Sequence, residues 1–146
     1  MIAYHFVTPS FLALALCGCN AFETTGSIGD HGDNTHKVID LVVSGGQPTK
    51  VDWFYSTNLD CTEIPGASGR VAVQPQHGEV VIEHKPDYPK FAPDNPHSQC
   101  NDRPVPSWVI TYVPARGFVG HDIFWLDESF AEGPTVNVDV NVDVQK

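Results

Sequence analysis

The sequence predicts an all-β protein, an antiparallel β-sandwich of about seven strands. From Lys37 onward, short segments alternate apolar and polar residues with a period of two, the pattern of strands with one buried face. Glycine and proline, 12 of each in 146 residues, supply the turns that many short strands need. No segment has the spacing of an amphipathic helix, so two packed sheets are the expected architecture.

The first three expected strands lie before residue 76. In the second of them, alternation places Val51, Trp53 and Tyr55 together on one face. In the third, Val71 and Val73 share a face by the same spacing. The three segments are KVIDLVV (37–43), KVDWFYS (50–56) and GRVAVQP (69–75).

The next three expected strands follow the same pattern. Val80 and Ile82 lie on one side of the fourth. In the fifth, Trp108, Ile110 and Tyr112 share a face, which makes it a strong candidate for a core strand. The segments are GEVVIEH (78–84), SWVITYV (107–113) and HDIFWLD (121–127).

The last segment, TVNVDVNVDV (135–144), has the clearest alternation in the chain. Its valines occupy every second position, so one face is dry and the other is wet. We expect Val138, Val140 and Val142 to point inward, and Asn137, Asp139 and Asn141 to point outward.

A long proline-rich loop separates the fourth and fifth strands. Six prolines lie between Lys85 and Ser107, and they argue against a central strand there. Long loops in compact domains are usually functional or held in place. Tyr88, Phe91 and His97 are the candidate binding residues in this loop. The aromatic pair would contact a sugar or a peptide if exposed, or fold back over the edge of the sandwich.

The segments PQHGEV (75–80) and YVPARGFVGHDIFW (112–125), followed by the alternating valines, resemble the bacterial immunoglobulin-like or cadherin-like repeat domain. The likeness covers about residues 70–144 and implies an immunoglobulin-like sandwich with a structural or adhesion-type binding role. Two departures are the inserted loop and the occurrence of the domain as a single copy. The positions that carry the family's turns are Pro75, Gly78, Tyr112, Pro114, Phe118, Gly120 and Asp122.

The adjacent His121 and Asp122 raise the question of a reactive pair. The preceding PARGF is a turn, in which Pro114 fixes φ and a glycine supplies a positive φ. Gly120 then lets the chain bend into the next strand. We therefore interpret Asp122 as a side-chain acceptor that ties down nearby backbone amides at a corner, with a reactive site as the alternative.

The first 18 residues are expected to be a signal peptide. No Lys, Arg, Asp or Glu occurs before Glu23, and the apolar run FLALALCGC (11–19) is too short to cross a bilayer. Its end, LCGC, resembles a bacterial lipobox, with Leu16 three residues before Cys19 and Gly18 immediately before it. The resemblance implies that Cys19 is lipidated and begins the mature protein. A plain cleaved signal and a buried first strand or helix are the alternatives.

Residues 19–36 read as a flexible tether, because they are polar and lack periodicity, and residues 37–146 form the sandwich domain. Asn20 follows the lipobox cysteine, which by the same resemblance favours the outer membrane. The expected location is therefore periplasmic or at the outer membrane through the lipid anchor, with secretion as the alternative.

Two of the four cysteines, Cys61 and Cys100, remain once Cys17 leaves with the signal and Cys19 carries lipid. In an oxidising compartment such a pair persists as a disulfide. Closing a loop of about 40 residues would stabilise the fold by roughly 3–4 kcal/mol. The alternative is a reactive thiol at Cys100 with His97 as its base.

The formal charge of −10 argues against nucleic-acid binding and against electrostatic attachment to anionic lipid. Motifs such as HExxH, GxSxG or paired cysteines at zinc spacing do not occur in the sequence, so we expect no catalytic residues and no cofactor. The predicted function is a non-catalytic envelope module whose partner is an envelope protein or a glycan. A periplasmic metal-binding protein using His97, His84 or His121 is the second hypothesis, and an enzyme is the third.

Overall fold

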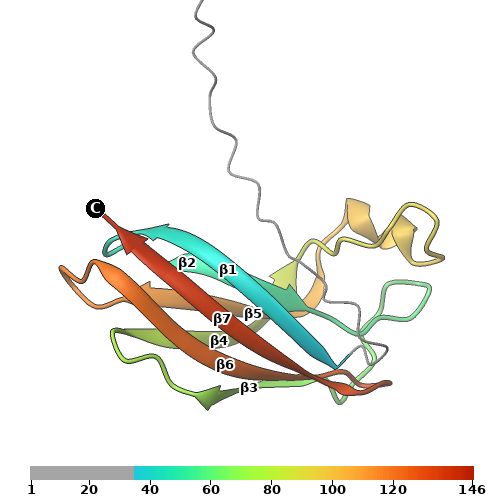
Figure 1. The fold of residues 1–146 in the computed structure, drawn as a ribbon. Coiled ribbons are helices and arrows are strands. Elements are labelled where there is room, and N and C mark those ends of the chain that lie inside the picture. The colour runs from blue at the N-terminus through green and yellow to red at the C-terminus, as the bar shows by residue number, and fades with distance from the viewer. Residues whose placement is uncertain (1–34) are drawn as a thin grey trace, which may run out of the picture.

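A computed structural model describes residues 35–146 of the chain, which form seven strands in two facing sheets (Figure 1). In this part of the chain no helix has the length and apolar character needed to cross a membrane. The predictions of a signal peptide, of lipidation at Cys19 and of a tether fall largely on residues 1–34, outside the described residues. The strands are β1 (His36–Ser44), β2 (Thr49–Phe54), β3 (Ser68–Val73), β4 (Gly78–Asp87), β5 (Val105–Pro114), β6 (Gly120–Ser129) and β7 (Thr135–Gln145).

The predicted seven-stranded β-sandwich is confirmed. One sheet has the order β1-β7-β6-β3, and the other has the order β2-β5-β4. One pairing differs from a purely antiparallel sandwich, because β1 runs parallel to β7. Parallel neighbours need a long connection, and β1 and β7 are joined through the whole of the intervening domain. Their register brings the apolar residues Ile39 and Leu41 beside Val140 and Val142 on the inner face.

The inward and outward positions of β7 are those that its alternation predicts. Val138, Val140 and Val142 are each no more than 1% exposed and belong to the main core. Asn137 and Asn141 are exposed, and Asp139 is half-buried. Because β7 lies between β1 and β6, its valines are covered on both sides as well as by the facing sheet.

Bulges overturn two of the expected faces. In β2 the pairing with β5 shifts between Lys50 and Asp52, so Val51 and Phe54 enter the main core, while Trp53 and Tyr55 do not. An extra residue in one strand reverses the alternation beyond it, which the period-two reading could not include. In β3 a similar shift between Val71 and Val73 leaves Val71 against the core and Val73 39% exposed. The expected faces of β4 and β5 agree with the structure: Val80, Ile82, Trp108, Ile110 and Tyr112 all contact or belong to the core.

The strands extend further into the proline-rich segment than the prolines suggest. β4 continues to Asp87, β5 begins at Val105, and Pro86 pairs with Pro106. The expectation that prolines exclude a central strand there was too strong for β5. Its pairing with β2 ends at Trp108, so Pro106 lies where β5 has a neighbour on one side only.

The corner at the opposite end is organised by Asp122. Its carboxylate accepts hydrogen bonds from the backbone amides of Gln76 at 2.9 Å and His77 at 2.8 Å, and from the Tyr112 hydroxyl at 2.9 Å. Burial, the hydrogen bond to Asp122 and the charge of that carboxylate together raise the pKa of Tyr112. Asp122 is buried, whereas the neighbouring His121 points outward and lies 3.6 Å from Asp143. His121 and Asp122 therefore form no reactive pair, because their side chains lie on opposite faces of β6.

The other turn positions of the predicted family pattern meet at the same corner. Gly78 is required there, because a Cβ on this residue would lie 2.5 Å from the Tyr112 ring. Gly117 has a φ of 79° in the turn that follows Pro114, and Gly120 has a φ of 135°. Phe118 packs nearby, stacked on His77 at 4.2 Å between ring centroids.

Candidate functional site

A disulfide joins the two loops at the other end of the sandwich. Cys61 and Cys100 are bonded, with their Cα atoms 5.5 Å apart, which confirms the predicted bridge. The alternative of a reactive thiol at Cys100 is wrong, since its sulfur is already bonded. Figure 1 shows the β2–β3 loop (green) and the inserted loop (yellow) projecting from this same end, which we call the loop end.

Polar contacts from the inserted loop add to the bridge. The Arg103 guanidinium donates to the carbonyl of Asp60 at 2.6 Å, and the Gln99 side-chain amide donates to the carbonyl of Leu59. The Asn101 side chain makes two hydrogen bonds at 2.9 Å with the backbone of Phe91, one at the amide and one at the carbonyl. The loop is therefore held to its neighbour and to itself without a strand ladder.

The three candidate binding residues of the loop separate into two groups. Phe91 is half-buried and contacts Tyr55 and His97, with ring centroids 5.1 Å and 5.2 Å away. It packs against a second small core formed by Cys61, Cys100 and Val105, so it folds back as the alternative reading foresaw. Tyr88 is 57% exposed, and its carbonyl accepts a hydrogen bond from the Trp53 indole.

Breaking the disulfide should release the loop and spare the sandwich. We expect the Cys61→Ser/Cys100→Ser double variant to lose about 3–4 kcal/mol of unfolding free energy, the value for closing a loop of this length. Limited proteolysis followed by mass spectrometry should then find the first cuts between Lys85 and Arg103. The far-ultraviolet circular dichroism of a sheet should persist. Identical first cleavage sites in the oxidised and variant proteins would contradict this account of the loop.

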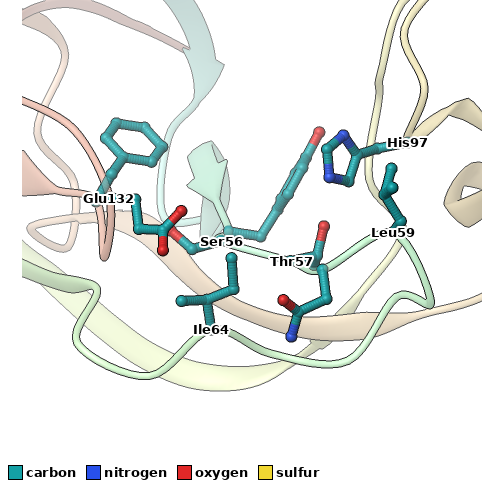
Figure 2. Close-up of a pocket in the computed structure, with 9 residues that line it drawn as sticks. Ser56, Thr57, Leu59, Ile64, His97 and Glu132 are labelled. Carbon is teal, nitrogen blue, oxygen red and sulfur yellow. The ribbon is translucent and has the colours of Figure 1, made fainter.

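Two adjoining pockets open at the loop end. The first, which we call the polar pocket, has a volume of about 380 Å³. Figure 2 shows Glu132 and His97 on opposite sides of it, with Thr57 between them. The hydroxyl of Thr57 is buried and has no hydrogen-bond partner within residues 35–146. The pocket therefore offers an unused donor and acceptor to a ligand.

The second pocket, which we call the aromatic pocket, has a volume of about 260 Å³. It shares Tyr55 and Phe130 with the polar pocket, so the two pockets adjoin. Its remaining walls come from β1, β2, the inserted loop and the end of β6. The residues that line it are Lys37, Trp53, Phe54, Tyr55, Phe91, Glu128 and Phe130.

Two acidic side chains and one lysine meet beneath the aromatic pocket. Lys37 of β1 forms an ion pair with Asp52 of β2, which is 8% exposed. Glu128 of β6 is only 2% exposed, and its Oε1 atom has no partner in the described part of the chain. Burial raises the pKa of Glu128 to about 8, the Asp52 carboxylate adds to the rise, and the Lys37 ammonium opposes it. Near neutral pH Glu128 is therefore protonated when the pocket is empty.

The aromatic walls are already in contact with cations. The Lys50 and Lys90 ammonium groups lie 4.2 Å and 4.8 Å from the centroid of the Trp53 ring. Burial raises the pKa of Tyr55, the backbone amide of Lys90 opposes the rise, and the charge of Asp52 adds to it. The Trp53 ring therefore contacts positive charge, and Tyr55 lies near the negative charge of Asp52.

The histidines proposed as metal ligands are not brought together. His84 pairs with Glu63 at 2.8 Å, His121 lies beside Asp143, and His97 lies within hydrogen-bond distance of Asn95. Across residues 35–146 there is no group of three or more His, Cys, Asp or Glu side chains placed to hold a metal ion.

Comparisons with known proteins add little. No protein-family model matches the chain, and no curated protein matches it. Among solved structures, the solution structure of amebosin is 14% identical over 78% of this chain and 100% of its own, with a TM-score of 0.43. An endo-fucoidan hydrolase of glycoside hydrolase family 107 is 9% identical over 74% of this chain and 12% of its own, with a TM-score of 0.29. At these scores neither likeness carries an argument about fold or function.

The residues at the floor of the aromatic pocket were not among those predicted from the sequence. One signal was present: in the sixth strand, Phe124, Leu126 and Glu128 alternate, which places Glu128 on the inner face with the two apolar residues. Asp52 gave no such signal, because only the bulge turns it inward. For Lys37 the alternation predicts only a position at the start of a strand, because its contact with Asp52 forms between the two facing sheets.

Proposed function

We propose that this protein is a non-catalytic binding module of a bacterial cell envelope, anchored by lipid at Cys19, whose loop end binds an envelope protein or glycan. The observation that carries the proposal is the pair of adjoining pockets at the loop end, with aromatic walls. Two buried polar atoms without partners in residues 35–146, on Thr57 and Glu128, border these pockets.

Several features support this function. Loops at one end of a rigid sandwich are a common place for recognition, because the sheets hold the loops in position. The disulfide fixes both loops before a ligand arrives, which lowers the ordering cost of binding. A bridge of this kind suits an exported protein. The resemblance to immunoglobulin-like and cadherin-like repeats agrees with a structural or adhesion-type role.

The proposal is tested by cross-linking in intact cells with a palmitate analogue present. The wild-type protein should carry the lipid label and cross-link to an envelope partner. Cys19→Ser should lose the label. Glu132→Lys reverses a charge at the polar pocket and should keep the label but lose at least four-fifths of the cross-link, an effect of about 1 kcal/mol or more.

The matched control is Glu79→Lys, which makes the same charge change at an exposed residue of β4, at the opposite end of the sandwich. It should keep both the lipid label and the cross-link. Equal cross-linking by the two lysine variants would contradict the placement of the binding surface at the loop end. Unchanged labelling of Cys19→Ser would remove the lipid anchor from the proposal.

A further inference from the structure

The floor of the aromatic pocket has one more acidic group than basic groups. Lys37 pairs with Asp52, and Glu128 is left with no basic partner among the described residues. An ionised carboxylate buried in this way costs free energy unless a cation or a proton accompanies it. In the empty pocket a proton neutralises Glu128, and a positively charged ligand group can take the place of that proton.

The walls of the pocket suit a cation on an aliphatic chain. Five aromatic side chains line it, and the faces of such rings carry partial negative charge: Trp53, Phe54, Tyr55, Phe91 and Phe130. Trp53 already takes two of the protein's own ammonium groups on its ring. Apolar rings around a carboxylate match a group with a methylene chain and a charged end.

We propose that the aromatic pocket binds an alkylammonium group, such as the side chain of a lysine, with its ammonium paired to Glu128 and its methylene chain between the aromatic rings. This inference rests on the proposed function and names the ligand chemistry of the same loop end. The polar pocket, which shares Tyr55 and Phe130, receives the remainder of the ligand. In the polar pocket, the buried hydroxyl of Thr57 has no hydrogen-bond partner within residues 35–146. A peptide group or another polar group of the ligand supplies that partner.

Binding exchanges a proton for the cation. The charged and titratable groups that face Glu128 are Asp52 and Lys37, with Tyr55 at the pocket wall. With the pocket empty, the pKa of Glu128 near 8 keeps it protonated at neutral pH. When the ammonium binds, the carboxyl proton leaves to solvent and the ion pair replaces it. The ammonium itself stays charged, since its pKa is about 10.4.

Calorimetry of the full disulfide-bonded protein with n-pentylammonium chloride tests the proposal, with 1-pentanol as the neutral control. We expect saturable binding of the amine at pH 9 and no saturable binding of the alcohol. Affinity should weaken about tenfold for each pH unit below 8, because only the ionised form of Glu128 binds. Titrations at pH 7 in buffers of different ionisation enthalpy should show release of close to one proton per amine bound.

Three variants should affect amine binding differently: the first weakens it, the second strengthens it and the third leaves it unchanged. Glu128→Gln keeps the shape and removes the charge, so amine binding should fall at least tenfold and lose its pH dependence. Lys37→Met removes the competing ammonium, so binding should become tighter. Glu79→Gln, on β4 at the opposite end of the sandwich, should stay within twofold of the wild type. The melting transition of each variant shows whether it is folded. If Lys37→Met folds only when amine is present, this rescue counts as evidence for amine binding in the same way as a tighter affinity.

The source of the ammonium is distinguished with peptides. Acetyl-Gly-Lys-Gly-amide should bind more tightly than n-pentylammonium if the backbone occupies the polar pocket, and the norleucine analogue should not bind. Absence of saturable amine binding at pH 9, equal binding of pentanol, or unchanged binding by Glu128→Gln would each overturn the proposal. Loss of the cellular cross-link in Glu132→Lys, but not in Glu128→Gln, would leave the proposed function standing and remove this inference alone.

Discussion

Replacing Val140 with aspartate should unfold the sandwich at 25 °C. Val140 is 1% exposed, and it lies on the central strand β7 between Ile39 of β1 and Phe124 of β6. The substitution buries a carboxylate with no basic group beside it and removes apolar contacts from two neighbouring strands. We expect a loss of about 5 kcal/mol or more, which exceeds the stability of many small domains. Urea unfolding followed by tryptophan fluorescence measures the change.

The adjacent position is the matched control for Val140→Asp. Asp139 points to the outer face, where it lies 3.2 Å from His36 and is 41% exposed at its side chain. Asp139→Val should therefore change the unfolding free energy by less than about 1 kcal/mol, as expected for an exposed pair. A large loss for Asp139→Val together with a small loss for Val140→Asp would mean that β7 is out of register by one residue.

Replacing Asp122 with alanine should have the second-largest effect. Its carboxylate accepts from the amides of Gln76, His77 and Ile123 and from the Tyr112 hydroxyl, all within 3.0 Å. Alanine leaves these donors without their acceptor at a corner where Tyr112 is fully buried. We expect a loss of about 3–5 kcal/mol, measured by urea unfolding, because orphaned buried donors keep their desolvation cost.

Two milder variants separate the contributions at this corner. Asp122→Asn keeps one acceptor oxygen, so it should lose less than Asp122→Ala. Tyr112→Phe removes the hydroxyl donor but leaves the hydrogen bonds from the backbone amides of Gln76 and His77, so it should cost about 1 kcal/mol. If Tyr112→Phe cost as much as Asp122→Ala, the hydrogen bond from the Tyr112 hydroxyl, and not the bonds from the backbone amides, would be the main contribution of the carboxylate.

The sequence was most informative where a strand keeps the same alternation of apolar and polar residues along its whole length. In β7 every second residue is valine, and the corner before β6 carries its own turn residues, so side-chain directions there could be predicted from local pattern. In β2 and β3 a single extra residue reversed the faces, and Trp53 and Val73 were misplaced. Nothing in KVDWF marks a bulge, because its position is set by pairing with a distant strand.

The binding site was harder to predict because no single segment carries it. The disulfide followed from counting cysteines, and it correctly placed the two loops together. The floor of the aromatic pocket instead combines Lys37, Asp52 and Glu128 from three strands in two sheets. Their meeting depends on the packing of the sheets and on the β2 bulge, which local alternation does not contain.

The placement of β7 has a consequence for how the protein is made. β7 comes last along the chain but lies inside its sheet, and its contact between Asn141 and Asp40 spans 101 residues. While the polypeptide emerges from a ribosome, β1 and β6 have no strand to join them. Their apolar faces stay open to aggregation throughout that interval, and contacts this distant in sequence form slowly. Folding of this domain therefore waits for the last strand, and a chaperone that binds the unfinished chain would have to hold it until β7 has emerged.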